Sequence, residues 1–525
     1  MRKPELTDFF THDQPLGPIN SSTIKSRNVM KHLFSTENLI YREMGHRPSA
    51  IIGRRGAGKT AALRSVYLSD DYDIIIELEA HKAFREIIDS IAEIATGAVF
   101  PEEVAELWNT MFWHTVLPAI AKQASGPSGR EVDAVKRYVS GMGIGAMQSP
   151  YRVMRKVVRI LKDRGGDKPI GMLGEFLEEE VFDDVTFIEA RSRAIEFMDQ
   201  NNLRAIILLD TLDDFQLEDT AMHHAISGLL KCQGEFRFPG SPCELRCCIP
   251  SEIFHQISEV SSNPIKDFQQ QLMVHWHAGE LIQIAARRYL EYLQLYYPDL
   301  HAEFDHLDSS KRSDARTFWQ AILPARVENK LGIVEGTIAY ILRHTQLLPR
   351  HLLTYLNSIA RITRRNGGHP GQFTYDAVVE GIHQTENTIC AGIFSAFRYA
   401  YPGAKQACER CLPYLPLHFE DSELHKAYIR RGKGIPNIFD YDDFKRMLIE
   451  IGAIGRATKT TRRYVEGVFE YIVPHKLIVS SADALCIHPL FCEIFSVVKP
   501  EKEANPRVIY PYGTDTDAEE FRQLN

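Results

Sequence analysis

Residues 50–60 read Ala-Ile-Ile-Gly-Arg-Arg-Gly-Ala-Gly-Lys-Thr, a short apolar run that leads into a glycine-rich loop. The last eight of these residues, Gly53 to Thr60, fit the spacing G-x-x-x-x-G-K-[ST]. Glycines let such a loop curl so that successive backbone N–H groups point at phosphate oxygens. A helix that begins near Thr60 adds its positive end. The stretch therefore predicts a phosphate-binding loop between a buried strand and a helix.

Two side chains of this loop carry specific chemistry. Lys59 is expected to reach the β- and γ-phosphates of a nucleoside triphosphate, and the Thr60 hydroxyl is expected to ligate Mg²⁺. A nucleoside triphosphate with Mg²⁺ is thus the predicted ligand. A chance match on a glycine-rich turn is the alternative, but the strand before the loop and the helix after it favour phosphate binding. The other predicted nucleotide-binding residues are Gly53, Gly56, Ala57, Gly58 and Ala61.

Two arginines, Arg54 and Arg55, occupy variable positions inside the loop. The backbone already supplies the phosphate cradle. We therefore expect both side chains to face solvent or a neighbouring subunit, although contact with phosphate is the alternative.

A second acidic motif follows the strongest apolar run of the chain. Residues 206–214 read Ile-Ile-Leu-Leu-Asp-Thr-Leu-Asp-Asp, and Asp210 ends the predicted strand. Its carboxylate is expected at the carboxyl edge of the sheet, on the Mg²⁺ side and acting through water. Asp213 or Asp214, with Asp214 favoured, is predicted to orient or deprotonate the attacking water. A helix N-cap is the alternative role for these two aspartates.

The remaining apolar runs fix the fold class. Strands are expected near 47–53, 73–79, 204–210, 244–249 and 272–276, with helical periodicity between them. Strands that alternate with helices predict an α/β fold with a parallel sheet covered on both faces. Helical stripes then dominate residues 278–386, and residues 387–498 combine helices with short strands in the manner of a winged helix. The predicted domains are a lead-in at 1–45, a P-loop core at 46–277 with a helical insertion at about 81–200, a helical lid at 278–386, a winged-helix domain at 387–498 and a polar tail at 499–525.

Together, Gly53–Thr60 and Leu208–Asp214 resemble the nucleotide motifs of P-loop ATPases of the AAA+/STAND group. The lid and winged helix are similar to the branch that includes origin-recognition/Cdc6-type ATPases and STAND switch proteins. The resemblance implies ATP hydrolysis that drives a switch or an assembly, and it suggests bacterial anti-phage defence as a setting. A homo-oligomer or a partner effector protein is implied as well.

The same resemblance suggests roles for residues outside the two motifs. Ser251, after the fourth strand, stands where the group places a γ-phosphate sensor, and Arg350 stands where a lid arginine reads the nucleotide. A surface arginine near a helix start is the alternative for Arg350. Arg287 and Arg288, on a predicted lid helix, are candidates for an arginine supplied to a neighbouring subunit.

A local basic segment contrasts with the acidic whole. Residues 425–463 carry ten basic and four acidic side chains, a net charge of +6, within a chain whose net charge is −8. Such a segment suits contact with the phosphate backbone of DNA, while a solvated face or a docking surface for an acidic protein is the alternative. The predicted DNA-contacting residues, on a loop before the last strands, are Arg456, Lys459, Arg462 and Arg463.

The amino-acid composition excludes several classes of protein. Hydrophobic residues make up 44% and charged residues 25% of 525, which is ordinary for a globular protein. No apolar run is long enough to span a bilayer, and the N-terminus lacks a signal-peptide core, so a cytoplasmic protein without membrane contact is expected. Nine cysteines without regular spacing predict buried or idle thiols, and metal binding by the pair Cys408 and Cys411 is the alternative.

Three functional classes remain from the sequence. The preferred one is a Mg²⁺-dependent ATPase that works as a switch or an assembly platform. The second is a DNA-binding initiator or loader in which ATP gates duplex engagement by the winged helix. The third is a scaffold that binds nucleotide without turnover, which the presence of Lys59, Thr60 and Asp210 disfavours.

Overall fold

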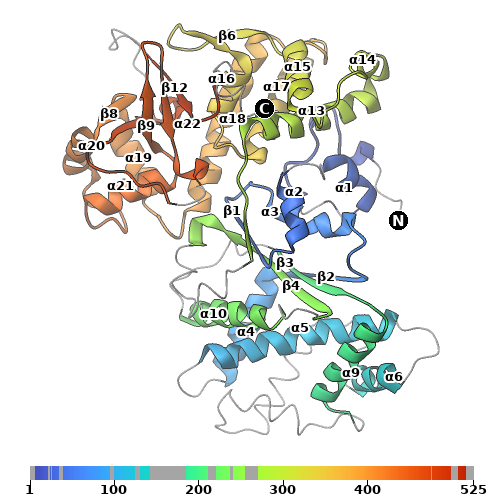
Figure 1. Ribbon diagram of the computed structural model, residues 1–525. Helices are drawn as coiled ribbons and strands as arrows, with labels where there is room; N and C mark the ends of the chain where they lie inside the picture. The colour runs from blue at the N-terminus through green and yellow to red at the C-terminus, as the bar shows by residue number, and fades with distance from the viewer. Residues whose placement is uncertain are drawn as a thin grey trace. The chain divides into compact units, whose positions relative to one another are not determined.

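The structure is a computed structural model that describes residues 6–21, 24, 26–34, 39–94, 100–123, 130–141, 185–210, 220–236, 241–254, 270–473, 476–497 and 507–515. The chain forms two compact units (Figure 1). We call residues 43–52 and 62–272 the sheet unit, and residues 1–42, 53–61 and 273–525 the lid unit. The phosphate loop belongs to the lid unit, whereas the strand before it belongs almost wholly to the sheet unit.

A five-stranded sheet in the order β2-β3-β4-β1-β5 is the centre of the sheet unit. Strand β2 pairs in parallel with β3, and β3 pairs in parallel with β4, so the predicted α/β class with a parallel sheet is confirmed. The strands are β1 (Ala50–Gly53), β2 (Ile74–Glu79), β3 (Ala205–Asp210), β4 (Cys243–Pro250) and β5 (Gln271–Met273). The fifth strand is shorter than the expected 272–276 and lies earlier.

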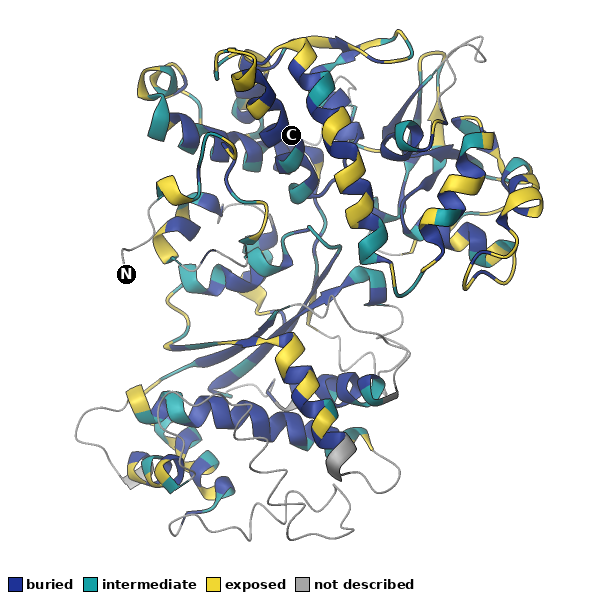
Figure 2. Cartoon of the chain, turned by 180° about the vertical axis from the view of Figure 1, so that it is seen from behind, coloured by how far each residue is buried: buried dark blue, intermediate teal, exposed yellow. Residues whose placement is uncertain are grey.

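Burial on both faces of the sheet explains why the central strand β3 is apolar from Ala205 to Leu209. Every residue from Ala205 to Leu209 is buried, since β3 has a strand on each side and its side chains leave the sheet on both faces (Figure 2). The strand ends at Asp210 as predicted and begins at Ala205, one residue later than the predicted Arg204. Asp210 is its last residue and is half-buried.

Helices of the expected insertion pack beside the sheet strands (Figure 1). The long helix α5 contacts α10 closely, and the indole N–H of Trp108 donates a 2.8 Å hydrogen bond to the Ala225 carbonyl oxygen. The helices of this unit are α4 (Ala80–Ile94), α5 (Pro101–Gln123), α6 (Arg130–Gly141), α9 (Phe187–Gln200) and α10 (Thr220–Glu235), while α3 (Lys59–Arg64) begins in the lid unit.

The lid unit contains the expected helical lid. Its stripe of apolar side chains on α17 includes Leu352, Leu356 and Ile359, all of which are buried. Strands β6 (Arg326–Glu328) and β7 (Val334–Gly336) form a hairpin that the sequence did not predict. The helices are α13 (Ala278–Tyr296), α14 (Pro298–Ala302), α15 (Arg312–Ile322), α16 (Thr337–Arg343), α17 (Pro349–Arg365) and α18 (Tyr375–Ala396).

The N-terminal residues are part of this lid rather than a loose lead-in. Phe10 and Leu16 are fully buried, and the Leu16 N–H donates a 2.8 Å hydrogen bond to Asn357 Oδ1. The short helix α1 (Arg27–Leu33) packs against α13. Apolar residues scattered through a proline- and glycine-rich stretch gave no periodic signal, so this packing was not predictable from pattern.

A winged-helix arrangement follows the lid. This region contains a five-stranded sheet in the order β12-β10-β9-β11-β8. Between strands β8 and β9, the chain forms a helix-turn-helix pair, α20 and α21. The elements are α19 (Ala404–Cys411), β8 (His418–Glu420), α20 (Asp421–Ala427), a π-helical turn (Tyr428–Gly432), α21 (Tyr441–Glu450), β9 (Ile454–Thr460), β10 (Tyr464–Val468), β11 (Ala484–Ile487), α22 (Pro489–Ile494) and β12 (Val508–Pro511).

Two expectations for this region differ from the structure. Arg456 and Lys459 lie on strand β9 rather than in a loop, and the turn between β9 and β10 is limited to Thr461–Arg463. The expected polar tail contains β12, whose residues are all buried and pair in parallel with β10. Only tertiary pairing supplies a partner for so short an apolar run.

In the part of the chain that the structure describes, no helix combines the length and the apolarity that crossing a membrane requires. All nine cysteines are buried thiols, including Cys408 and Cys411 on α19.

Candidate functional site

The phosphate loop has the backbone that its glycines predict. Gly56 and Gly58 have φ values of +96° and +92°, in the left-handed region that glycine adopts without a steric penalty. The Ala57 N–H donates a 2.9 Å hydrogen bond to the Arg54 carbonyl oxygen, which closes the turn. Helix α3 begins at Lys59, directly after the loop. The loop is therefore curled at the positive end of a short helix.

Lys59 is held inside this curl. Its side chain is buried, with 4% of the residue exposed, and Nζ donates hydrogen bonds to the carbonyl oxygens of Gly53 at 2.9 Å and Arg54 at 3.3 Å. These are contacts that an entering phosphate oxygen can replace, since an ammonium group has three donors. Thr60 is the next residue of α3 and is half-buried.

The indole of Trp276 holds the backbone of the phosphate loop. Trp276 Nε1 donates a 2.7 Å hydrogen bond to the Ala57 carbonyl oxygen, and the residue is buried. Val274 lies against Gly53, where an added Cβ would come within 3.0 Å of the Val274 Cβ. The sequence analysis assigned residues 272–276 to a strand and missed the contact of Trp276 with the loop. The only hint in the sequence was that a buried tryptophan usually needs an acceptor for its indole N–H.

Arg350 of the lid lies over the loop. Its backbone N–H donates to the Gly56 carbonyl oxygen at 3.4 Å, and a Cβ added at Gly56 would lie 3.1 Å from the Arg350 Cβ. Arg350 is the second residue of α17, and Leu347 just before this helix has a left-handed φ of +47°. The backbone bend at Leu347 thus brings the start of α17 to the loop.

Arg54 departs from the prediction of a solvent or subunit contact. Its guanidinium donates to the Glu450 carbonyl oxygen at 2.5 Å and to Gln346 Oε1 at 3.2 Å. The same group lies 5.4 Å from the ring centre of Phe397 and 5.6 Å from that of Tyr471. Glu450 is the last residue of α21, the second helix of the helix-turn-helix pair. The prediction for Arg54 was wrong because a cation can satisfy the carbonyl groups at a helix C-terminus.

Gln346 completes this contact. It is buried, and its Nε2 donates a 2.9 Å hydrogen bond to the Ile451 carbonyl oxygen while its Oε1 accepts from Arg54. Its backbone N–H donates to Nδ1 of His351. Burial, then the charges of Arg350 and Arg54, lower the pKa of His351 to about 3, so this ring stays neutral and keeps its acceptor. Arg55 donates separately to Ser395 Oγ at 3.3 Å.

The acidic residues belong to the sheet unit. Asp210 ends β3, and Ser251 directly follows β4, the neighbouring parallel strand. Their strands therefore end at the same edge of the sheet, and both residues are half-buried. Asp213 and Asp214 lie outside the described residues. The catalytic and metal-binding roles of these four residues stay predictions.

The two candidate trans arginines differ from each other. Arg288 is buried on α13, and its guanidinium donates to the carbonyl oxygens of Leu16 at 3.3 Å and Pro18 at 3.0 Å. Burial lowers the pKa of Arg288 to about 10. This residue holds the N-terminal segment, so it is not presented to a neighbouring subunit. Arg287 donates to the Lys31 carbonyl oxygen at 2.8 Å in a more exposed position.

The predicted DNA-contacting residues lie along one hairpin of the winged helix. Lys459, Arg462 and Arg463 are exposed, at the end of β9 and in the turn to β10. Arg456 lies closer to the sheet centre and donates to the Ile478 carbonyl oxygen. The hairpin tip therefore presents three cations, together with exposed Thr458 and Thr460.

Comparisons with known proteins give distant structural likenesses. No protein-family profile matches the chain, and no curated protein matches its sequence. The ORC2 protein of Aeropyrum pernix, solved as ADPNP–ADP complexes, is similar at 11% identity over 87% of this chain and 90% of that one, with a TM-score of 0.37. The ORC1 protein of Aeropyrum pernix in complex with DNA is similar at 13% identity over 92% of this chain and 96% of that one, with a TM-score of 0.31.

Proposed function

We propose that this chain is a Mg²⁺-dependent P-loop ATPase that works as a nucleotide-driven switch. The observation that carries the proposal is that one loop, Gly53–Thr60, has both the curled backbone of a phosphate site and direct contacts to the lid and the winged helix. A loop that served only to bind nucleotide would need neither the contact of Arg54 with α21 nor the contact of Arg350 with Gly56.

The residues fit a triphosphate and its metal ion. Loop N–H groups and Lys59 provide donors for phosphate oxygens, and Arg350 adds a cation on the lid side. Thr60 at the start of α3 and Asp210 at the end of β3 offer the oxygen ligands that Mg²⁺ prefers. Bound Mg²⁺ would neutralise charge on the transferred phosphate group. Asp213 or Asp214 would then orient the attacking water, and Ser251 would sense the γ-phosphate.

The switch itself follows from competition for the loop. A phosphate tail draws Lys59 away from the Gly53 and Arg54 carbonyl groups, which changes the backbone that carries the Arg54 side chain. That side chain holds the end of α21. Nucleotide would therefore favour the arrangement in which Lys59 contacts phosphate over the one in which Lys59 contacts the loop carbonyl groups. Such a difference in contacts is the requirement for a ligand to shift a conformational equilibrium.

Nucleotide binding with matched lysine variants tests the ATPase proposal. We expect Lys59→Ala to abolish binding of ATP with Mg²⁺ in calorimetry, whereas Lys82→Ala, which removes an exposed lysine paired with Glu79, should bind like wild type. Asp214→Ala or Asp213→Ala should retain binding and stop hydrolysis. Absence of ATP binding by the wild type would end this proposal, and unchanged hydrolysis in both aspartate variants would remove their assigned role.

A DNA-binding initiator or loader is the second candidate, because the hairpin tip presents Lys459, Arg462 and Arg463 to solvent. Contacts with DNA phosphates would make the affinity fall steeply with salt. We expect the double variant Arg462→Glu/Arg463→Glu to weaken duplex binding and flatten its salt dependence. The double variant Arg364→Glu/Arg365→Glu, at the exposed end of α17, makes the same charge change and should not. Equal losses in both variants would indicate a general charge effect instead.

Assembly distinguishes the two candidates. Size-exclusion chromatography with light scattering, with and without ATP and duplex DNA, should show a larger species with ATP alone for an assembling switch. A species that needs DNA as well would favour the loader. A role in anti-phage defence and a partner effector protein stay predictions from the resemblance.

A further inference from the structure

Three metal-ligating side chains meet where the lid packs on the winged helix. His383 and Glu386 lie one turn apart on α18, and Glu493 lies on α22, a helix that α18 contacts. One ligand atom from each residue lies within 4.8 Å of the other two. His383 Nδ1 is 3.8 Å from Glu493 Oε2. Two helices from different parts of the lid unit thus contribute to one cluster.

Glu386 has an unsatisfied position in this cluster. The residue is only 2% exposed, and its Oε1 makes no hydrogen bond. Nε2 of His344 lies 3.7 Å from this oxygen, which is too long for a hydrogen bond. A buried carboxylate oxygen without a partner is costly, so the site requires a positive partner or a proton.

His344 cannot supply that partner. Its Nδ1 lies 2.7 Å from the Tyr340 carbonyl oxygen, and a carbonyl group only accepts, so the ring proton is on Nδ1. Nε2 therefore presents a lone pair to Glu386. A neutral imidazole has one ring proton, so Nε2 has none to donate to Glu386. Two acceptors face each other in a buried place, and either a metal ion or a proton on Glu386 would satisfy both.

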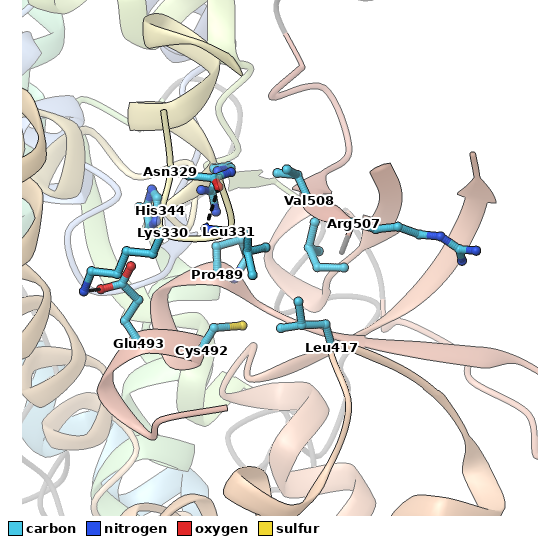
Figure 3. A pocket seen from close by; sticks show the side chains of 12 residues that line it. Asn329, Lys330, Leu331, His344, Leu417, Pro489, Cys492, Glu493, Arg507 and Val508 are labelled. Atoms are coloured by element: carbon cyan, nitrogen blue, oxygen red, sulfur yellow. Dashed lines mark hydrogen bonds and ion pairs between the residues drawn. The ribbon is translucent and has the colours of Figure 1, made fainter. Parts of the chain in front are cut away.

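The nearby cations Arg343 and Lys330 are paired with carboxylates other than Glu386. Arg343 makes a two-bond ion pair with Glu335, with both distances 2.9 Å. Lys330 forms an ion pair with Glu493, as Figure 3 shows, but its side chain is 56% exposed. The small pocket in Figure 3, lined by His344, Glu493 and Lys330 among others, borders the cluster. An ion that enters there would displace Lys330 rather than a buried group.

We propose that His383, Glu386 and Glu493 form a binding site for a divalent transition-metal ion, with zinc as the best match, and that His344 lies in reach as a further nitrogen ligand. Imidazole and carboxylate ligands in a small cluster suit zinc better than the oxygen-only sites that suit Mg²⁺. The ion would join α18 of the lid to α22 of the winged helix. The site is separate from the phosphate loop, so it is structural or regulatory.

Zinc binding by the full chain, without nucleotide, tests this site. Zinc content after equilibrium dialysis and affinity by chelator competition should both fall in His383→Ala, with affinity at least about tenfold weaker. His383 is exposed, so this variant should fold. His81→Ala is the matched control, because His81 is about as exposed as His383 and lies 3.7 Å from Glu79, whose carboxylate is exposed. Equal zinc binding by wild type and His383→Ala would overturn the proposal.

Two further variants separate a metal site from a protonated carboxyl group. Zinc should raise the thermal midpoint of the wild type and leave that of Glu386→Gln unchanged, although the variant keeps the shape of the side chain. Lys330→Met should strengthen zinc binding several-fold because it removes the competing cation. A zinc response retained in Glu386→Gln, or weaker zinc binding in Lys330→Met, would contradict the assignment.

Discussion

Arg54 shows how one residue can connect a ligand loop to a distant domain. Its position in the loop is fixed by the glycine spacing around it, but its contacts are to Gln346, to the end of α21 and to two aromatic rings. The Glu450 carbonyl oxygen would otherwise lack its intrahelical donor. The residue therefore stabilises α21 and the loop together.

Arg54→Ala should loosen α21. Loss of a charged donor from a helix C-terminus should cost about 2 kcal/mol, and amide exchange over Tyr441–Glu450 should speed up accordingly. Arg55→Ala is the neighbouring control, because Arg55 donates to Ser395 on α18 instead. Hydrogen exchange read by mass spectrometry would measure both. Equal protection of α21 in Arg54→Ala and wild type would contradict the proposed link.

At the scale of elements, close helix packing decides where a side chain fits. Gly228 and Gly234 lie on the same helix, α10. A Cβ at Gly228 would come within 2.5 Å of Val104 Cγ1 and 2.8 Å of the Val104 carbonyl carbon on α5, whereas a Cβ at Gly234 would meet nothing within 4 Å.

Alanine at these two positions should therefore have opposite effects. Gly228→Ala should lower the free energy of unfolding by about 1–3 kcal/mol, because backbone on α5 cannot move aside easily. Gly234→Ala should leave it unchanged or raise it by up to about 1 kcal/mol through helix propensity. Urea unfolding of both variants measures the difference. Similar losses at both positions would show that α5 and α10 do not pack as described.

A buried histidine gives the same helical insertion a pH dependence. His114 on α5 donates from Nδ1 to the Thr110 carbonyl oxygen at 2.6 Å, and its Nε2 accepts from the Tyr138 hydroxyl at 2.8 Å. The ring also stacks on Phe187. Burial lowers its pKa from 6.5 to about 4 in the folded state.

Stability should therefore fall on the acid side. Below pH 6.5 the imidazole of His114 binds a proton in the unfolded chain but stays neutral in the folded chain. The contribution of His114 to the free energy of unfolding is therefore fully present above pH 6.5 and is lost progressively down to about pH 4. The loss from this one group is roughly 3 kcal/mol at the lower limit. Urea unfolding of wild type and His114→Gln between pH 7 and pH 4 should show a steeper acid decline in the wild type. Parallel profiles would refute the assignment.

At the scale of the whole molecule, each unit contains contacts between segments far apart in sequence. In the lid unit, the Tyr510 hydroxyl on β12 donates a 2.8 Å hydrogen bond to Glu335 Oε2 on β7, and Glu335 is also held by Arg343. Tyr510 and Val508 pack with Ala339 of α16. The last strand thus connects the winged-helix sheet to the lid.

Tyr510→Phe should weaken that connection. The change removes the hydroxyl donor to a buried carboxylate but keeps the ring, so the expected loss is about 1–2 kcal/mol of unfolding free energy. Tyr512→Phe, two residues on and 41% exposed, is the control and should be neutral. Thermal unfolding of both variants gives the comparison. A neutral Tyr510→Phe would indicate that β12 does not contribute to the stability of the lid unit.

The sequence by itself determined the local features whose signals are short-range. The glycine spacing around Lys59 dictated the curled loop, and the apolar run before Asp210 dictated the central buried strand, because backbone freedom and side-chain periodicity act within a few residues. Alternation of strands and helices was enough for the α/β class. The candidate positions Lys59 and Thr60 came from the same kind of local spacing, whereas Arg350 came from the resemblance to a family.

Tertiary structure alone decided what those local features touch. Arg54 on the end of α21, Trp276 behind the loop, the burial of the N-terminal segment and the pairing of β12 each depend on residues far away in sequence. No local pattern encodes such contacts, since an arginine or a short apolar run is compatible with many partners. Burial and hydrogen-bond satisfaction select one partner only when the packed chain brings them together.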